Sequence, residues 1–355
     1  MGSPSSAVAT HAAYPAQDAS SGAHRAIAAW LLACCVLVFA MVVVGGVTRL
    51  THSGLSITEW QPIVGTLPPL SAADWEAAFA KYQATPEYRL VNAGMGLDEF
   101  KRIFWWEYAH RLLGRLIGAA FLVPFLWFAF RRAIPRGYGA MLAAIFVLGG
   151  LQGALGWYMV KSGLVDDPRV SQFRLTAHLA LAFLIFGAML WVALSLLRAR
   201  GARPESAGLR RAGLLVAALV FLMVVSGGFV AGIRAGFAYN TFPLMNGALV
   251  PPEIMLIDPW WKNFFYNMAT VQFDHRAIAL ALALAVPGLW WAVTRSKSSP
   301  AARLGANLLL GMLGVQIGLG IATLLLVVPL PLAAAHQAGA VLLFALALNL
   351  AHALR

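Results

Sequence analysis

Apolar residues form stretches in this chain that are long enough to cross a lipid bilayer. A membrane-spanning helix needs about 20 predominantly apolar residues. Eight stretches reach or approach that length: 26–47, 110–130, 139–160, 175–197, 212–233, 275–294, 304–328 and 332–354. In the second of them only 116–130 is free of charge, so it needs the preceding polar segment AHRLLGR to reach full length. The pattern predicts an all-α integral membrane protein with eight transmembrane helices.

Composition supports lipid as the solvent and excludes a nucleic-acid partner. The 355 residues are 60% hydrophobic and only 11% charged, a balance that would leave a soluble domain with large exposed apolar patches. The net charge of +12 is unevenly distributed. The segments on the side of both termini hold thirteen of the 26 Lys/Arg but two of the 14 acids, Asp18 and Glu205. By the positive-inside rule, both termini are expected in the cytoplasm.

The sequence of the first four predicted helices recurs in the last four. VVVGGVTRL (42–50) resembles VVSGGFVAG (224–232), and LGGLQGALG (148–156) resembles LGVQIGLG (313–320). EYAHR, from Glu107, matches QFDHR, from Gln272. Such internal repeats predict duplicated architecture. We therefore expect two tandem pseudo-symmetric four-helix bundles.

The expected boundaries follow from composition and from this repeat. An Ala/Ser/Gly/Pro-rich disordered tail is expected over 1–25, the first bundle over 26–197, a basic linker over 198–211 and the second bundle over 212–355. The first outer loop contains SAADWEAAFAKYQ (71–83), which predicts a short helix lying at the membrane surface.

Four of the eight histidines, His110, His178, His275 and His336, recur at equivalent places of the repeat. They precede apolar stretches that end at arginines on the basic side, 21, 20, 20 and 19 residues further on. At 1.5 Å per residue, each imidazole lies roughly 30 Å from the inner surface. All four are therefore predicted at one depth, near the outer boundary of the hydrocarbon. The remaining histidines have no repeat partner and are interpreted as non-ligands: His11, His24, His52 and His352.

A single histidine at this depth is typical of an interfacial residue that hydrogen-bonds to a loop. Ionisable groups inside a membrane usually face a bundle interior and a partner. Two histidines on facing helices of a four-helix unit are suited to bis-imidazole ligation of a flat metal macrocycle. The pairs would be His110 with His178 and His275 with His336. Zinc would need further converging ligands, and a di-iron site would need several carboxylates that the predicted bundles lack. Glycines on the third and seventh helices suit either a planar ligand or close helix packing.

One acidic residue distinguishes the two halves. The repeat places Glu107 opposite Gln272, three residues before a candidate ligand and on the same helix face. Glu107 can form an i,i+4 ion pair with Arg111, but a purely structural pair would suit both halves. The asymmetry favours chemistry in the first half. Arg111 and Arg276 each follow a candidate ligand and are candidate partners for macrocycle carboxylates, although snorkelling arginines would look the same.

The motif GGVTRLTHSGLSITEWQPIVGTLPP (45–69), together with EYAHR and the repeated histidines, resembles the haem A synthase family of proteobacteria and mitochondria. The resemblance covers the chain from about residue 26 to the end. It implies an enzyme that oxidises the C8 methyl group of haem O to the formyl group of haem A by successive hydroxylations, in support of cytochrome oxidase biogenesis. It also implies that Glu107 is the catalytic residue, that His110 and His178 hold the substrate haem, and that His275 and His336 are the axial ligands of a haem b cofactor.

Partners and location follow from the same resemblance. It implies a bacterial inner-membrane protein with its haem sites toward the periplasm, haem O synthase as donor of the substrate, and an unidentified electron partner. A homo-oligomer is compatible with the sequence. Many bacterial members carry cysteine pairs in the outer loops, and this chain has only Cys34 and Cys35, inside its first apolar stretch.

Two other classes of function remain compatible with the residues alone. A di-haem membrane cytochrome would use the same histidine pairs only to pass electrons. A transporter with a duplicated fold would explain the repeat but would give no reason for four histidines at one depth.

Overall fold

The computed structural model describes residues 17–60, 64–165, 168–198 and 206–355, and within these ranges it is helical apart from loops and one isolated bridge. Eight helices of this described part are long and apolar enough to cross a membrane. They are α1 Gln17–Leu50, α4 Leu97–Phe130, α5 Tyr138–Gly163, α6 Gln172–Leu197, α7 Ala207–Gly232, α9 Met268–Arg295, α10 Pro300–Leu325 and α11 Leu330–Ala353. Each predicted apolar stretch coincides with one of them, so the all-α, eight-span prediction is confirmed and the chain is a multi-pass membrane protein.

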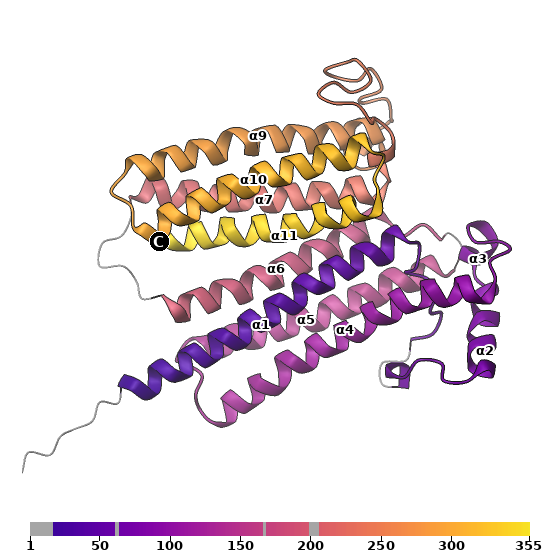
Figure 1. Cartoon of the computed structure of the whole chain (residues 1–355), viewed down its shortest axis with the longest axis horizontal. Helices are drawn as coiled ribbons and strands as arrows, with labels where there is room; N and C mark the ends of the chain where they lie inside the picture. Colours follow the sequence, from indigo (N-terminus) through magenta and orange to yellow (C-terminus); the bar gives the residue numbers. More distant parts are fainter. Residues whose placement is uncertain (1–16, 61–63, 166–167, 199–205) are drawn as a thin grey trace, which may run out of the picture.

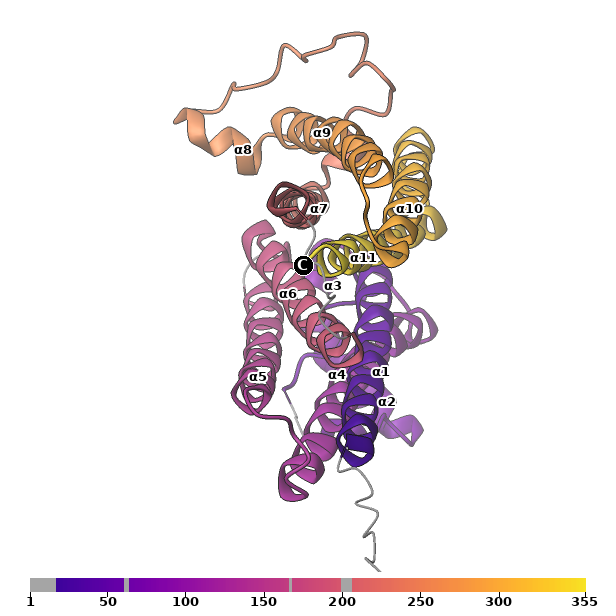
Figure 2. The ribbon, with the colours of Figure 1, turned by 90° about the vertical axis from the view of Figure 1, so that its left-hand side faces the viewer.

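The spanning helices form two groups that follow the order of the sequence. Figure 1 shows α1, α4, α5 and α6 together on one side and α7, α9, α10 and α11 on the other. Seen end-on in Figure 2, helices α1, α6, α7 and α11 meet in the middle, while α4, α5, α9 and α10 lie outside them. This arrangement agrees with two tandem bundles.

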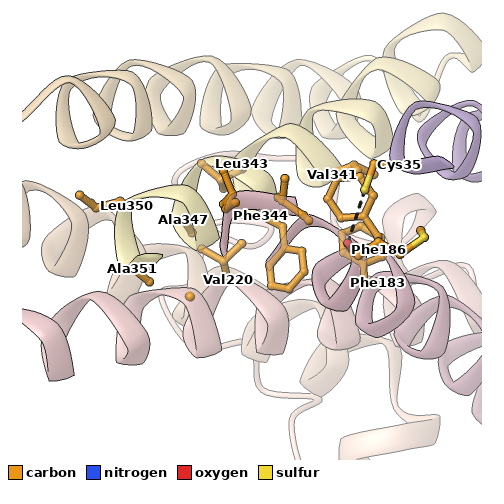
Figure 3. Packing of buried hydrophobic residues seen from close by; sticks show 14 of the residues in the cluster. Cys35, Phe183, Phe186, Val220, Val341, Leu343, Phe344, Ala347, Leu350 and Ala351 are labelled. Carbon is orange, nitrogen blue, oxygen red and sulfur yellow. Dashed lines mark hydrogen bonds between the residues drawn. The ribbon is translucent and has the colours of Figure 1, made fainter. Parts of the chain in front are cut away.

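The interface between the two groups is apolar and closely packed. Figure 3 shows Phe183 and Phe186 of α6 beside Phe344 of α11, with ring centroids of Phe183 and Phe344 5.6 Å apart. Cys35 of α1 is a free, buried thiol whose Sγ lies 3.8 Å from the Phe186 carbonyl oxygen, in agreement with a packing role. Gly187 lets α6 approach α11, because a Cβ there would stand 3.1 Å from Phe344. Small residues at such contacts are typical of helix packing in membranes.

All the long connections gather at one end of the molecule (Figure 1). The first outer loop carries α2 Ala72–Gln83 and α3 Pro86–Leu90, which confirms the predicted short helix. Ser71 caps α2 by accepting a hydrogen bond from the backbone amide of Asp74. Three 3₁₀ turns and a short helix complete the outer elements: η1 Val64–Thr66, η2 Ala235–Phe237, η3 Trp260–Lys262 and α8 Asn263–Tyr266.

Helix α4 begins well before the apolar stretch that predicted it. Its first turns carry Phe100 and Phe104, which pack with Tyr82 of α2 in a small aromatic cluster outside the main core. Burial of these rings stabilises an extra three turns. Glu107 is therefore the eleventh residue of α4, and the helix predicted over 110–130 with the segment AHRLLGR starts earlier than expected.

Two other expected boundaries also need correction. Helix α1 begins at Gln17, so the second part of the predicted 1–25 tail is helical, whereas 1–16 lies outside the described residues. Once a long apolar helix exists, each added residue gains a hydrogen bond at little cost. Helix α7 begins at Ala207, capped by Ser206, so the end of the predicted 198–211 linker is helical.

Candidate functional site

The two histidines of the first half lie on α4 and α6, each against a glycine of the helix before it. A Cβ added to Gly45 would stand 3.0 Å from Nε2 of His110, and one added to Gly156 would stand 3.0 Å from Cε1 of His178. Gln152 donates to the backbone carbonyl of His178 at 3.0 Å, which fixes that helix turn against α5.

The second half repeats this arrangement on α9 and α11. A Cβ added to Gly227 would stand 3.3 Å from Cε1 of His275, and one added to Gly320 would stand 2.9 Å from Cε1 of His336. Gln316 donates to the His336 carbonyl at 2.9 Å, as Gln152 does to that of His178. In both halves the candidate histidines thus lie against glycines of the preceding spanning helices, and a glutamine forms an interhelical hydrogen bond to one of them. The pairing of the histidines at an iron stays a prediction.

Two of the four imidazoles, those of His178 and His336, have a buried nitrogen atom without a hydrogen-bond partner among the described residues. The atom is Nδ1 in both cases. A buried polar atom without a partner is costly, so an iron or a proton acceptor at these positions would fit. Within the described residues, no group of three or more His, Cys, Asp or Glu could hold a metal ion. Two protein ligands per half are too few for a structural zinc site and match the axial ligands of a macrocyclic iron.

Glu107 is buried at 2% exposure and accepts hydrogen bonds at both carboxylate oxygens. Its Oε2 accepts from Ser56 Oγ at 2.7 Å and from the Ile57 amide at 2.8 Å. Its Oε1 accepts from Arg111 Nη2 at 2.6 Å and Nε at 3.0 Å. Arg111 also donates to the carbonyls of Ile57 and Glu59. The acid and the arginine therefore clamp loop residues 56–59 onto α4, one turn outward of His110.

Gln272 occupies the equivalent position and forms a different set of bonds. Its Nε2 donates to the Ala235 carbonyl at 2.8 Å, and its Oε1 accepts from Arg276 Nη2 at 2.9 Å. Arg276 also donates to the carbonyls of Tyr239 and Thr241. This second clamp binds a loop as well, but with an amide that both donates and accepts. Arg111 and Arg276 are thus committed to loop carbonyls, and their binding of carboxylates stays a prediction.

The sequence did not predict the contact of His52 in the first half with Arg234 in the second half. His52, interpreted as a simple loop residue, lies against Arg234 of the other half, with Arg234 Nη2 3.3 Å from its Nδ1. Burial, Arg234 and then Arg49 lower the pKa of the His52 imidazole below its usual range. The repeat contained the signal, since His52 and Arg234 stand seven residues after the first glycine of each Gly-Gly pair.

Comparison with known proteins agrees with this geometry. A sequence model described as "Cytochrome oxidase assembly protein" matches residues 28–348. The heme A synthase of Nitrosospira multiformis is 62% identical over 343 residues, covering 95% of this chain and 96% of that protein.

The chain belongs to the family of cytochrome oxidase assembly proteins that this model describes, which includes heme A synthases. Other heme A synthases in it are those of Nitrosomonas eutropha, 58% identical over 92% of both chains, and Parvibaculum lavamentivorans, 52% identical over 93% of this chain and 95% of that protein. The resemblance expected from the motif at 45–69 is thereby confirmed. These similarities extend over both halves, so the family includes the duplicated arrangement and all four histidines lie within the matched range.

Proposed function

We propose that this protein is a haem A synthase that oxidises the C8 methyl group of haem O to a formyl group. The observation that carries the proposal is the duplicated imidazole pair with a carboxylate beside only one copy: Glu107 in the first half and Gln272 in the second. Its many heme A synthase relatives support the same assignment. The first half would take the substrate, because it alone carries the acid.

In this proposal His275 and His336 hold haem b, and His110 and His178 hold the iron of the substrate haem. The donor set fits: two imidazoles per half, set against glycines that leave no side chain beside the rings. Bound haem b supplies one-electron transfer between the substrate site and an outside partner, and its potential depends on its ligands and burial. The Gln152 and Gln316 bonds hold the helix turns that carry His178 and His336.

Glu107 has two roles in this proposal. Its four accepted hydrogen bonds fix loop residues 56–59 over the site, which helps to exclude water. It also keeps a carboxylate one helical turn from His110, where negative charge would stabilise positive charge developing at the oxidised methyl carbon. Both oxygens of this carboxylate are already engaged by donors of the protein, which favours electrostatic and positioning roles over general-base catalysis.

The proposed setting is the bacterial inner membrane with both termini in the cytoplasm and the histidines toward the periplasm. The positive-inside distribution of arginines supports this orientation. Haem O synthase is the expected donor of the substrate, and the electron partner stays unidentified. A homo-oligomer is compatible with the outward-facing apolar helices α4 and α5.

The test is conversion in cells that make haem O and lack their own haem A synthase. Wild-type protein is expected to yield haem A in extracts separated by reversed-phase chromatography. Glu107→Gln protein should accumulate in the membrane with bound haem but form little haem A. Purified protein that binds haem b yet never forms haem A with haem O supplied would favour a di-haem cytochrome. Protein without any haem would favour a transporter.

A further inference from the structure

Residues that the internal repeat relates to each other meet at the outer end of the interface between the halves. An offset of 182 residues relates the two Gly-Gly pairs, and the same offset separates Arg49 from Ala231 and His52 from Arg234. The guanidinium of Arg49 donates to the Ala231 carbonyl, and that of Arg234 contacts the His52 ring. Contacts between repeat-equivalent residues place this cluster on the pseudo-twofold axis.

The cluster is cationic, and within the described residues no ion pair neutralises it. In the described part of the chain, ion pairs link Lys81 to Glu59, Lys101 to Asp98 and Arg111 to Glu107, and none includes Arg49 or Arg234. The acid that Arg234 influences electrostatically is Glu87 of α3, which forms no ion pair with it. Two guanidinium groups beside each other, with Arg49 partly buried between helices, are unfavourable unless an anion joins them.

The cluster lies just outward of the candidate iron ligands of both halves. Arg49 stands four residues after Gly45, which faces His110, so it lies on the same helix face about 6 Å further out at 1.5 Å per residue. On the other side, Ala231 stands four residues after Gly227, which faces His275. The cations therefore lie about one helical turn from the glycines that face a candidate iron ligand in each half.

We propose that Arg49 and Arg234 form one carboxylate-binding site, shared by the two halves, that binds haem propionate groups. The inference rests on the proposed function. Arginine presents a planar fork that matches carboxylates, and among the described residues these two side chains use only part of their donors: Arg49 donates to the Ala231 carbonyl and Arg234 contacts the His52 ring. Arg111 and Arg276, by contrast, already donate to three and four protein acceptors. Because the Arg49 guanidinium reaches Ala231 of α7, this residue of the first half would bind propionates of haem b in the second half.

The test is the midpoint potential of haem b in purified protein reconstituted with protohaem or with its dimethyl ester. With protohaem, Arg49→Gln is expected to lower the potential, because loss of a cation favours the ferric state. A tenfold shift of the one-electron equilibrium corresponds to 59 mV. Arg49→Lys should retain most of the wild-type potential. With the dimethyl ester the Arg49→Gln effect should be clearly smaller, because only the direct effect of the cation on the iron remains once the carboxylates are blocked.

Two further variants complete the experiment. Arg234→Gln, at an exposed position, should show a smaller shift in the same direction, and it provides the same test if Arg49→Gln protein fails to fold. Arg102→Gln, an exposed arginine of α4 away from the cluster, is the matched control and should leave the potential unchanged.

The outcomes separate this inference from the proposed function. Wild-type protein that binds no haem would overturn the proposed function and the shared site with it. Bound bis-histidine haem whose potential is the same in wild type, Arg49→Gln and Arg234→Gln would overturn only the shared site. An equal shift with protohaem and with the diester would also overturn it, since the arginine would then act through the fold and not through a propionate.

Discussion

The two halves of the molecule fix an outer loop in the same place by different chemistry. In the first half the carboxylate of Glu107 accepts four hydrogen bonds, two from the loop and two from Arg111. In the second half the amide of Gln272 donates one bond to its loop and accepts one from Arg276. The loop clamp therefore does not require an acid. What the first half gains from Glu107 is a carboxylate one helical turn from His110. In the proposed function this difference separates a site for reaction from a site that only holds a cofactor.

The largest effects are expected from removing a candidate haem ligand in one half or in the other. His275→Ala should abolish bound haem b, because an iron held by two imidazoles loses an axial ligand and the site has no third candidate ligand among the described residues. His110→Ala should keep haem b but lose haem A formation. Absorbance and low-temperature electron paramagnetic resonance spectra of the purified variants measure this. Retained bis-histidine haem b in His275→Ala protein would contradict the assignment of the second half.

Exchanging the clamp residues tests the comparison itself. Glu107→Gln is expected to reduce haem A formation about 100-fold, the usual scale for removing a group that stabilises charge in a transition state. The amide also leaves a loop donor unsatisfied, since Ser56, Ile57 and Arg111 all donate to Glu107. The reverse change, Gln272→Glu, places a carboxylate against the Ala235 carbonyl and should weaken the second loop without creating activity. Haem A yield per unit of haem b is the measurement, and an active Glu107→Gln protein would refute the role of the charge.

A smaller effect is expected where glycine lies against a histidine. A methyl group at Gly320 would stand 2.9 Å from Cε1 of His336, whereas one at Gly318 of the same helix meets nothing within 4 Å. Gly320→Ala should therefore displace the imidazole and destabilise the haem-loaded protein by about 1–3 kcal/mol, the usual cost of overpacking. Gly318→Ala should be neutral or slightly stabilising. Thermal unfolding of the two variants is followed at the haem absorbance. Equal melting temperatures for Gly320→Ala and Gly318→Ala would argue against a close approach of Gly320 to His336.

The smallest predicted effect concerns the outer loop, where the first half has a structure that the second lacks. Burial raises the pKa of Glu87 in α3 to about 7, against the lowering influence of Arg234. A carboxyl whose folded pKa is raised destabilises the fold as pH rises from its unfolded pKa, near 4.5, through 7. Glu87→Gln should thus stabilise the protein at pH 8 relative to wild type, by on the order of 1 kcal/mol, and make little difference at pH 4.5. The measurement is the melting temperature of wild-type and Glu87→Gln protein at pH 4.5 and pH 8. The same difference between the two proteins at both pH values would contradict the prediction.

Periodicity and spacing predicted much of this structure. Eight apolar stretches coincide with eight helices because lipid demands a fixed length of apolar helix. The common depth of His110 and His275, inferred from their distances to Arg131 and Arg295 at the ends of the apolar stretches, stays a prediction. The difference between Glu107 and Gln272 could be recognised from sequence because the two repeats can be aligned and compared position by position.

The contacts between halves could not be predicted in the same way. The meeting of Arg49 with Ala231 depends on how two bundles pack around an axis, which no single helix pattern encodes. The early start of α4 was also missed, because its first turns bury Phe100 and Phe104 against α2 in the outer loop and not in the membrane. The commitment of Arg111 to loop carbonyls depends on a loop conformation that sequence does not display.

The account depends on haem bound in both halves of the duplicated bundle, and a pyridine haemochrome assay of purified wild-type protein tests this directly. Protein from cells that also make haem O should contain haem b together with haem O or haem A, at up to one of each kind per chain. Protein that contains no haem under these conditions would contradict the account.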